Sequence, residues 1–224
     1  MPIYLNIHTH HPSTEKDTLS IKNAQTVSGW MDMAVGKFSV GLHPWYIKPE
    51  SIDEDFAQLE KLARQPNILA IGECGLDRLI NLEMSFQKEV FIRQIHLAES
   101  LQKPIIIHCV KAYSELIALK KKLKPRIPMI VHGFNNNTQI CQQLINHQFY
   151  ISLGSALLNP ESNASKNILT IPIKQLFLET DDKNCFISTI FAHASTYLTE
   201  PVEVLQEQIL QNFKRVVSAD SSVV

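Results

Sequence analysis

The sequence is short of several features that mark specialised classes of protein. It has no run of 18 apolar residues, so no membrane-spanning helix is expected. Lys and Arg number 21 and Asp and Glu 22, and the net charge of −1 lacks the basic excess of a dedicated nucleic-acid-binding protein. The first residues show no basic segment followed by an apolar stretch. We therefore expect no secretion signal and a cytoplasmic protein.

Cysteine is also scarce, and its spacing excludes two common kinds of site. Cys74, Cys109, Cys141 and Cys185 are far apart, and no C-x-x-C pair occurs. A zinc ribbon and a thioredoxin-type motif are therefore excluded. Without a secretion signal, free thiols that are mostly buried are expected in preference to two disulfides.

Glycine is the third scarce residue: there are seven, fewer than the nine histidines. The remaining composition, 45% hydrophobic and 19% charged, is ordinary for a globular protein with a buried core. A length of 224 residues fits one domain, spanning residues 1–224. The unusual feature is thus the abundance of histidine.

Short apolar runs alternate with segments of helical periodicity along the chain. Strands are predicted at 3–8, 19–23, 38–42, 68–73, 104–109, 128–132, 149–153 and 175–180. Helices are predicted at 53–64, 83–101, 112–123, 138–146, 186–197 and 200–216, the last with Thr199 as its N-cap. This alternation predicts an α/β fold, a (β/α)8 TIM barrel, with an open doubly wound sheet as the alternative. Residues 9–37 are too few for two full helices, so the first crossovers are expected to be shortened.

Polar side chains gather where the predicted strands end. They are His8, His10, His43, Glu73, Asp77, His108, His132, Glu179 and Asp181. In a TIM barrel the carboxyl ends of the strands form one rim, which carries the catalytic groups. Alternation along a strand turns His8 and His10 to the same side. These residues are therefore expected to converge on one site.

The residue types at these strand ends suit a metal centre. Imidazole and carboxylate ligands favour zinc, iron, manganese or nickel over calcium. Four histidines and two carboxylates would supply about six ligands, enough for two ions roughly 3.5–4 Å apart that share one carboxylate.

Two other groups leave their interpretation open. Lys120, Lys121 and Lys122 end a predicted helix, where they could bind phosphate but where a solvent-exposed face at the helix C-terminus fits better. Trp45 and Tyr46 follow a strand end, where they would either stack on a substrate or form a hydrophobic lid.

The order of the motifs resembles that of the TatD family of metal-dependent deoxyribonucleases, which are amidohydrolase-like barrels. The stretches that carry the resemblance are His8-Thr9-His10, Gly41-Leu42-His43-Pro44, Ile71-Gly72-Glu73-Cys74-Gly75-Leu76-Asp77, Gln87 with Phe91, Pro104-Ile105-Ile106-Ile107-His108, Val131-His132-Gly133-Phe134, Tyr150-Ile151-Ser152, Leu178-Glu179-Thr180-Asp181 and Asn212-Phe213. They span nearly the whole chain in the family's order.

The resemblance implies a role for each candidate residue. One ion would be held by His8, His10, Glu73 and Asp181, and a second by Glu73, His108 and His132. Asp181 would orient or deprotonate the attacking water, so Asp181 and Glu73 are the implied catalytic residues. His43 and Asp77 would contact the substrate or support the metal ligands. Arg78 is a further candidate for substrate contact, chosen for its charge and not by the resemblance.

The activity implied by the resemblance is that of a divalent-metal-dependent hydrolase, a nuclease that cleaves phosphodiesters with metal-activated water. Two divalent ions are implied, with zinc favoured over magnesium, manganese, nickel and iron. The implied substrate is DNA or a small phosphoester, and neither a membrane nor an obligatory protein partner is expected.

The sequence also departs from the family's pattern. Asn6 stands where members usually have Asp, and Val110 stands where an Arg commonly follows the histidine that corresponds to His108. The usual Pro-containing, Arg-rich loop after Asp181 is replaced by Asp182-Lys183-Asn184-Cys185. Two alternatives therefore stay open: a metal-dependent hydrolase of a small phosphoester, amide or ester, and a non-catalytic metal-binding barrel.

Overall fold

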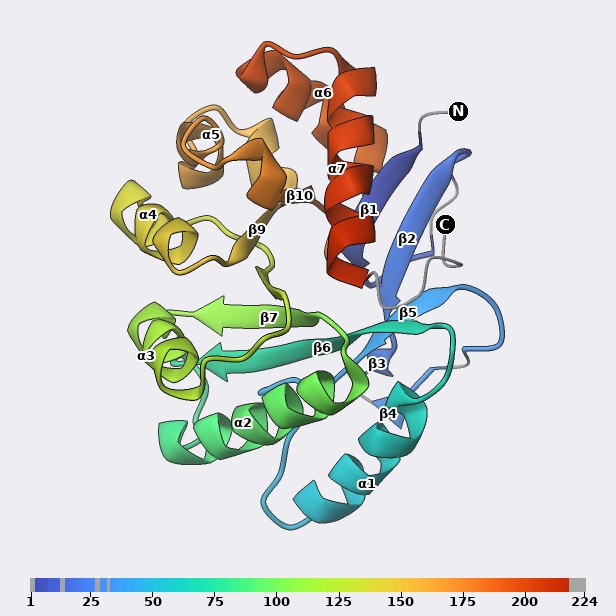
Figure 1. Ribbon diagram of the computed structural model, residues 1–224, viewed down its shortest axis with the longest axis vertical. Coiled ribbons are helices and arrows are strands. Elements are labelled where there is room, and N and C mark those ends of the chain that lie inside the picture. Colours follow the sequence, from blue (N-terminus) through green and yellow to red (C-terminus); the bar gives the residue numbers. More distant parts are fainter. Residues whose placement is uncertain (1–2, 13–14, 27–28, 32, 218–224) are drawn as a thin grey trace. The chain divides into compact units, whose positions relative to one another are not determined.

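The computed structural model describes residues 3–12, 15–26, 29–31 and 33–217 (Figure 1). It divides into two compact units. The first unit comprises residues 1–22 and 130–224, and the second unit comprises residues 23–129.

Parallel strands form the centre of the first unit. They are β1 (Tyr4–Thr9), β2 (Thr18–Asn23, whose last residue falls in the second unit), β8 (Met129–Val131, whose first residue falls there too), β9 (Tyr150–Leu153) and β10 (Leu176–Leu178). β1 pairs with β2, and β9 pairs with both β8 and β10. A parallel bridge between Thr9 and Asp181 links β1 to the segment that follows β10. This bridge brings the ends of the first and last strands together.

Helices cover these strands. They are α4 (Thr138–Asn146), α5 (Asn163–Asn167), α6 (Ile187–Leu198) and α7 (Val202–Val217), with short 3-10 turns at Ser155–Leu158 and Ile173–Gln175. Helix α7 lies beside β1 and β10 (Figure 1). It buries Leu205, Ile209, Phe213 and Val216, which recur at helical spacing on one face. Burial of this apolar stripe fixes α7 against the strands.

The described residues of the second unit form three parallel strands and a small hairpin. The strands β5 (Lys37–Val40), β6 (Ile68–Asp77) and β7 (Ile105–Val110) pair in that order. The hairpin pairs β3 (Gln25–Thr26) with β4 (Gly29–Trp30). The helices of this unit are α1 (Ile52–Ala63), α2 (Met84–Leu101) and α3 (Tyr113–Leu123). α1 and α2 pack against β6, which is buried at every position.

β6 continues four residues beyond the predicted strand, through Gly75 to Asp77. Gly75 has a φ of +149° and lies opposite His108 on β7, so close that a Cβ atom would overlap the His108 carbonyl group. Only glycine allows this approach of the two backbones. The extension places Asp77 on the same strand as Glu73.

The predicted elements are confirmed in kind and order, and the short first crossovers with them. In the described part of residues 10–36 no helix occurs, and the β3–β4 hairpin takes the place of one. The predicted role of Thr199 is wrong. It ends α6 in the left-handed conformation, with a φ of +55°, and α7 begins only after Pro201.

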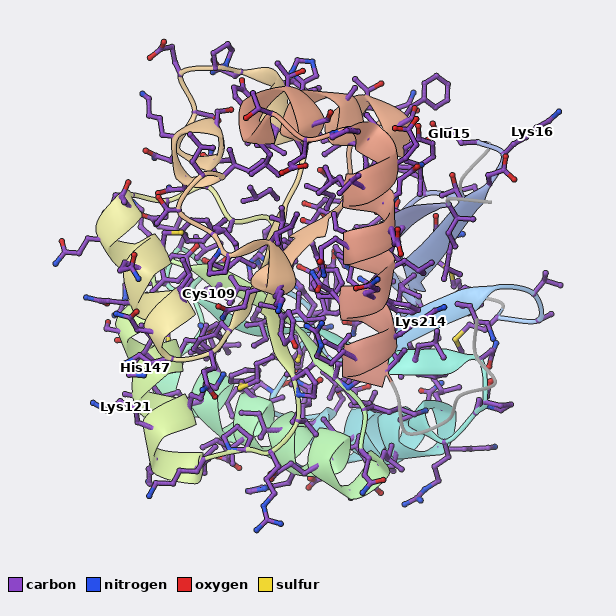
Figure 2. All side chains as sticks on the ribbon, turned by 45° about the horizontal axis from the view of Figure 1, so that its top comes forward. Glu15, Lys16, Cys109, Lys121, His147 and Lys214 are labelled. Carbon is purple, nitrogen blue, oxygen red and sulfur yellow. The ribbon has the colours of Figure 1, made fainter. Side chains whose placement is uncertain are left out.

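The expectation of free and mostly buried cysteines is confirmed: all four are free, and Cys74, Cys109 and Cys141 are buried. The expectation of a solvent-exposed lysine face holds for Lys121 and Lys122 in the last turn of α3, and Figure 2 shows Lys121 projecting outward. It is wrong for Lys120, which is half-buried. Within the described ranges, every helix is too short or too polar to cross a membrane.

Candidate metal centre

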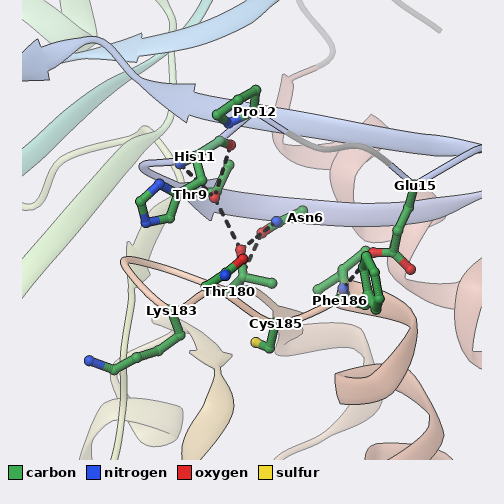
Figure 3. Close-up of a pocket in the computed structure, with 11 residues that line it drawn as sticks. Asn6, Thr9, His11, Pro12, Glu15, Thr180, Lys183, Cys185 and Phe186 are labelled. Atoms are coloured by element: carbon green, nitrogen blue, oxygen red, sulfur yellow. Dashed lines mark hydrogen bonds between the residues drawn. The ribbon is translucent and has the colours of Figure 1, made fainter.

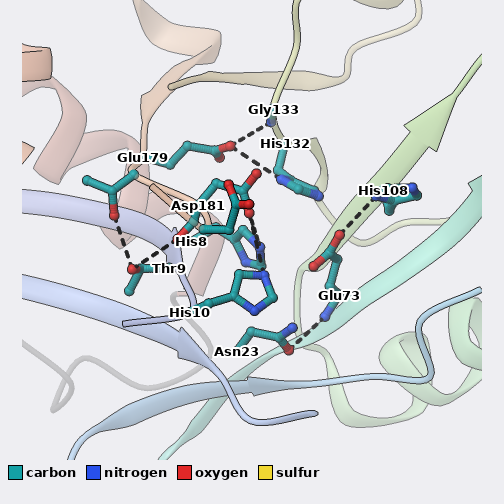
Figure 4. A network of polar contacts seen from close by, with 12 residues as sticks. His8, Thr9, His10, Asn23, Glu73, His108, His132, Gly133, Glu179 and Asp181 are labelled. Atoms are coloured by element: carbon teal, nitrogen blue, oxygen red, sulfur yellow. Dashed lines mark hydrogen bonds and ion pairs between the residues drawn. The ribbon is translucent and has the colours of Figure 1, made fainter. Parts of the chain in front are cut away.

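The candidate residues of the first unit form one cluster at the ends of β1, β8 and β10 (Figure 4). His8 lies on β1 and His10 directly follows it, and their ring centroids are 5.1 Å apart on the same side, as their alternation predicts (Figure 4). Nε2 of His8 lies 3.6 Å from Oδ1 of Asp181, and Nε2 of His10 lies 3.5 Å from the same oxygen. The backbone fixes this arrangement, because the Asp181 N–H donates to the His8 carbonyl oxygen (3.1 Å) and the His10 N–H donates to that of Asp181 (3.0 Å).

His132 completes this cluster from β8, and Glu179 holds it there. The imidazole centroids of His132 and His8 are 4.3 Å apart. Nδ1 of His132 lies 3.3 Å from Oε1 of Glu179, which also accepts the Gly133 N–H at 2.6 Å. Glu179 is fully buried. In the sequence Glu179 is recognisable as an acid at a strand end, but nothing there predicts its contact with His132.

The Asp181 carboxyl is held in its charged form. Burial alone would raise its pKa, but hydrogen bonds from His10 and His8 and the charge of His132 hold it far below the usual value. Asp181 is therefore a carboxylate at neutral pH, the form that binds a cation.

Asn6 holds Thr180, the residue that precedes Asp181, in place. Its side chain accepts the Thr180 N–H (3.1 Å) and donates to the Thr180 hydroxyl oxygen (2.8 Å). That hydroxyl donates in turn to the Thr9 hydroxyl oxygen (3.1 Å). An ionised Asp at position 6 could accept these bonds but donate none, so the amide specifies the direction of this chain of hydrogen bonds. Asn6, Thr9 and Thr180 also line a cavity of about 270 Å³ that reaches Phe186 (Figure 3).

The second unit carries its own cluster, with Glu73 at its centre. Oε1 of Glu73 lies 3.0 Å from Nε2 of His43 and 3.0 Å from Nδ1 of His108. Two side-chain amides fix the backbone of this cluster: the His43 N–H donates to Oε1 of Gln25 (2.6 Å), and the Glu73 N–H donates to Oδ1 of Asn23 (3.3 Å). Sequence reasoning missed both amides, because nothing local marks their partners.

Asp77 connects His108 to Trp45. Its Oδ2 lies 3.2 Å from Nε2 of His108 and accepts the Trp45 indole N–H at 2.7 Å, while its Oδ1 accepts the Leu79 N–H at 2.8 Å. Burial would raise the pKa of this carboxyl, but the hydrogen bonds from Trp45, Leu79 and His108 lower it overall. The ionised Asp77 thus orients the His108 ring.

Arg78 is turned away from the Glu73 cluster. Its guanidinium forms an ion pair with Glu115, and its Nε donates to the carbonyl oxygen of Lys111 (3.0 Å). The other predicted residues of the second unit, His43, Glu73, Asp77 and His108, all lie in the polar network.

The residues present fit a divalent cation. Potential ligand atoms of three side chains lie within 4.8 Å of one another in each of three sets: His8, His10 and Asp181; His132, Glu179 and Asp181; and His43, Glu73 and His108. Oε2 of Glu179 is buried without a hydrogen-bond partner among the described residues, a costly state for a carboxylate that a nearby cation would relieve. Imidazole and carboxylate sets of this kind suit zinc and similar metals.

Parallel strands covered by helices, with imidazole and carboxylate clusters at the strand ends, define an α/β protein with a candidate metal centre. The chain belongs to the TatD related DNase family, whose sequence profile matches residues 22–218. This match confirms the resemblance drawn from the motifs.

Two similar proteins have names that refer to metal-dependent hydrolysis or to exonuclease activity. The chain is 32% identical over 149 residues to the "Uncharacterized metal-dependent hydrolase YabD" of Bacillus subtilis, with 64% of this chain and 57% of that protein covered. It is 30% identical over 147 residues to the "3'-5' ssDNA/RNA exonuclease TatD" of Cronobacter turicensis, with 64% and 56% covered. The chain thus spans just over half the length of these two relatives.

A solved structure shows the fold. The chain aligns with the crystal structure of YjjV, a TatD homologue from Escherichia coli, with a TM-score of 0.76 and 21% identity, covering 90% of this chain and 87% of that one. The predicted fold class, an α/β TIM-barrel-like fold, is confirmed by this likeness.

Proposed function

We propose that the chain is a divalent-metal-dependent hydrolase of the TatD type that cleaves phosphodiester bonds in nucleic acid. The observation that carries the proposal is the pair of imidazole and carboxylate clusters at the strand ends. The family profile and a relative named as a single-strand exonuclease support nucleic acid as the substrate class.

The proposed metal ligands are His8, His10, Glu73, His108, His132 and Asp181, which would hold two divalent ions, zinc first among them. The short distances support this assignment, because Asp181 already faces His8 and His10 and Glu73 already faces His108. Bound divalent ions would lower the pKa of water and neutralise charge that develops on the phosphate.

The chain's own residues then have separate tasks in the proposed reaction. Asp181, ionised between His8 and His10, orients the attacking water and takes its proton. Glu73 fixes the positions of the His43 and His108 rings relative to each other, because one of its carboxylate oxygens lies next to a nitrogen of each ring. Asp77 positions His108 from its other ring nitrogen.

A small phosphoester is a second candidate substrate, and one observation favours it. The Arg78 guanidinium is paired with Glu115 and position 110 is Val, so neither supplies a cationic clamp for a polynucleotide phosphate. A net charge of −1 points the same way. Cleavage of a small aryl phosphodiester, with no cleavage of oligonucleotides, would select this alternative.

The proposed setting of the protein is a reducing compartment, the cytoplasm. Its four free cysteines, three of them buried, support this, because disulfides are rare where thiols are kept reduced.

Nuclease assays of Asp181→Asn and His132→Ala, with metal analysis of each purified protein, test the proposal. We expect both variants to stay folded and to lose cleavage of a labelled single-stranded oligonucleotide. Leu169→Ala, which truncates an exposed side chain of the first unit, serves as the control and should keep full activity. Full activity in both site variants would overturn the mechanism.

A further inference from the structure

Both tryptophans of the chain line one cavity in the second unit. The sequence contains only Trp30 and Trp45, and they share the wall of a cavity of about 380 Å³ with Tyr46, Lys48 and Gln25. The rest of the wall includes the Asp55 carboxylate. Three aromatic side chains with a few polar groups are the lining expected of a site for a flat, partly polar ligand.

Trp45 stands between this cavity and the Glu73 cluster. Its indole N–H is fixed to Asp77 at 2.7 Å, and its ring centroid lies 5.0 Å from that of His43 and 5.7 Å from that of His108. Yet 57% of the residue is exposed. A Trp that served only the core would be covered, whereas this ring is held rigidly by its polar end with more than half of its surface open to solvent.

Trp30 and Tyr46 are also connected to His43, Trp30 through Gln25 and Tyr46 directly. Trp30 lies directly opposite Gln25 in the β3–β4 hairpin, and Oε1 of Gln25 accepts the His43 N–H at 2.6 Å. The Tyr46 N–H donates to the His43 carbonyl oxygen (2.9 Å), and the rings of these two residues are 5.4 Å apart. The aromatic wall and the metal-ligand candidates thus share one scaffold.

We propose that this cavity binds an unpaired base of a nucleic-acid substrate, stacked on Trp45, while the neighbouring phosphodiester lies at His43, Glu73 and His108. Stacking on an aromatic ring accepts every base, because every base has a π face. The exposed Lys48 adds a positive charge for a phosphate, and the Gln25 and Asp55 side chains offer polar groups to the edge of the base. Bases in a duplex are paired and stacked on one another, so the cavity selects single strands.

This inference rests on the proposed nuclease function, but base binding can be measured without catalysis. Trp30→Phe leaves Trp45 as the only tryptophan, and Trp45→Phe leaves only Trp30. In EDTA, deoxynucleoside 5′-monophosphates should quench the fluorescence of both variants in a saturable way, after correction against N-acetyltryptophanamide. Deoxyribose 5-phosphate, which has no base, should not. Absence of quenching, or equal quenching by the abasic compound, would overturn the proposal.

Kinetics then separate the cavity from the proposed reaction. Single-stranded oligonucleotides with a normal or an abasic terminal residue are the two substrates. Trp45→Ala and Trp45→Phe both remove the indole N–H that Asp77 accepts, so the comparison between them isolates the stacking ring. The KM of Trp45→Ala should be roughly tenfold above that of Trp45→Phe for the normal substrate and equal to it for the abasic one. The control Leu169→Ala should change the KM for neither substrate. The same ratio of the two variants' KM values for both substrates would contradict base stacking. If the wild type quenches with nucleotides but cleaves no substrate with any metal, base binding stands and the nuclease function fails.

Discussion

Glu179 holds the ring of His132: Oε1 of the carboxylate lies 3.3 Å from Nδ1 of the imidazole and also accepts the Gly133 N–H at 2.6 Å. With no exposed surface on Glu179, the pair is shielded from water. Residues that orient a ligating histidine are worth a large share of metal affinity. The pair therefore yields the first prediction.

Glu179→Gln should weaken zinc binding by roughly 10–100-fold, because the negative charge that orients His132 is lost while the Gly133 N–H keeps an acceptor. Isothermal titration of the metal-free protein measures this. Glu161→Gln, at an exposed position of the same unit, is the matched control. Unchanged zinc affinity in Glu179→Gln would show that this carboxylate has no part in metal binding.

Asp181→Asn should lower phosphodiester cleavage by roughly 100-fold or more, since the carboxylate that orients water and takes its proton becomes a neutral amide. The low pKa of Asp181 means that the wild-type carboxylate stays charged under any ordinary assay condition. Protonation of Asp181 should therefore cause no fall in the wild-type rate under those conditions. Activity of Asp181→Asn equal to that of the wild type would show that this carboxylate neither orients the water nor takes its proton.

Asn6→Ala should destabilise the fold by about 1–3 kcal/mol, because the buried Thr180 N–H loses its acceptor and the Thr180 hydroxyl loses its donor. Urea unfolding measures the change. The exposed Asn146, which accepts a hydrogen bond from Gln142, provides a control as Asn146→Ala. A change as small as that of the control would mean that the Asn6 bonds add nothing to stability.

Much of the fold follows from the sequence because its strands are dense in β-branched and aliphatic residues. The apolar residues before His108 and before Glu179 are examples, and both runs are buried in β7 and β10. The extension of β6 could not be predicted from the sequence, because Gly72 and Gly75 are residues typical of turns. Its strand pairing depends on β7, far away in the sequence. Helix α5 was missed since Asn163–Asn167 is rich in polar residues that favour turns.

The candidate site, too, has contacts that could be predicted from the sequence and contacts that could not. His8, His10 and Asp181 could be predicted to meet, because strand alternation and the order of strand ends place them together. The partners of Glu179, Asn23 and Gln25 could not, since each contact depends on register between segments distant in sequence. Arg78 was chosen for its charge, but Glu115 on α3 takes its guanidinium.

Lys120→Met should stabilise the protein near neutral pH. Burial lowers the pKa of Lys120 from its ordinary 10.5 to about 8 in the folded chain. Below pH 8 the wild type carries the full cost of a partly buried charge, and between about 8 and 10.5 the unfolded chain binds more protons, so that cost disappears as the pH rises. The advantage of the variant should shrink over the same interval.

Thermal unfolding of the wild type and Lys120→Met from pH 6 to pH 10.5 tests this. The exposed neighbour serves as the control through Lys121→Met. A difference in unfolding free energy that is the same at pH 7 and pH 10.5 would contradict the lowered pKa.

The most direct test of the proposed function is the cleavage of a single-stranded oligonucleotide by the wild-type chain before and after removal of its metal. Dialysis against EDTA, followed by buffer free of chelator, gives the metal-free protein. The proposed function predicts that cleavage is lost in this protein, returns when zinc, manganese or magnesium is added back, and does not return in Asp181→Asn. Undiminished cleavage after complete metal removal, or none with any of these metals, would contradict it.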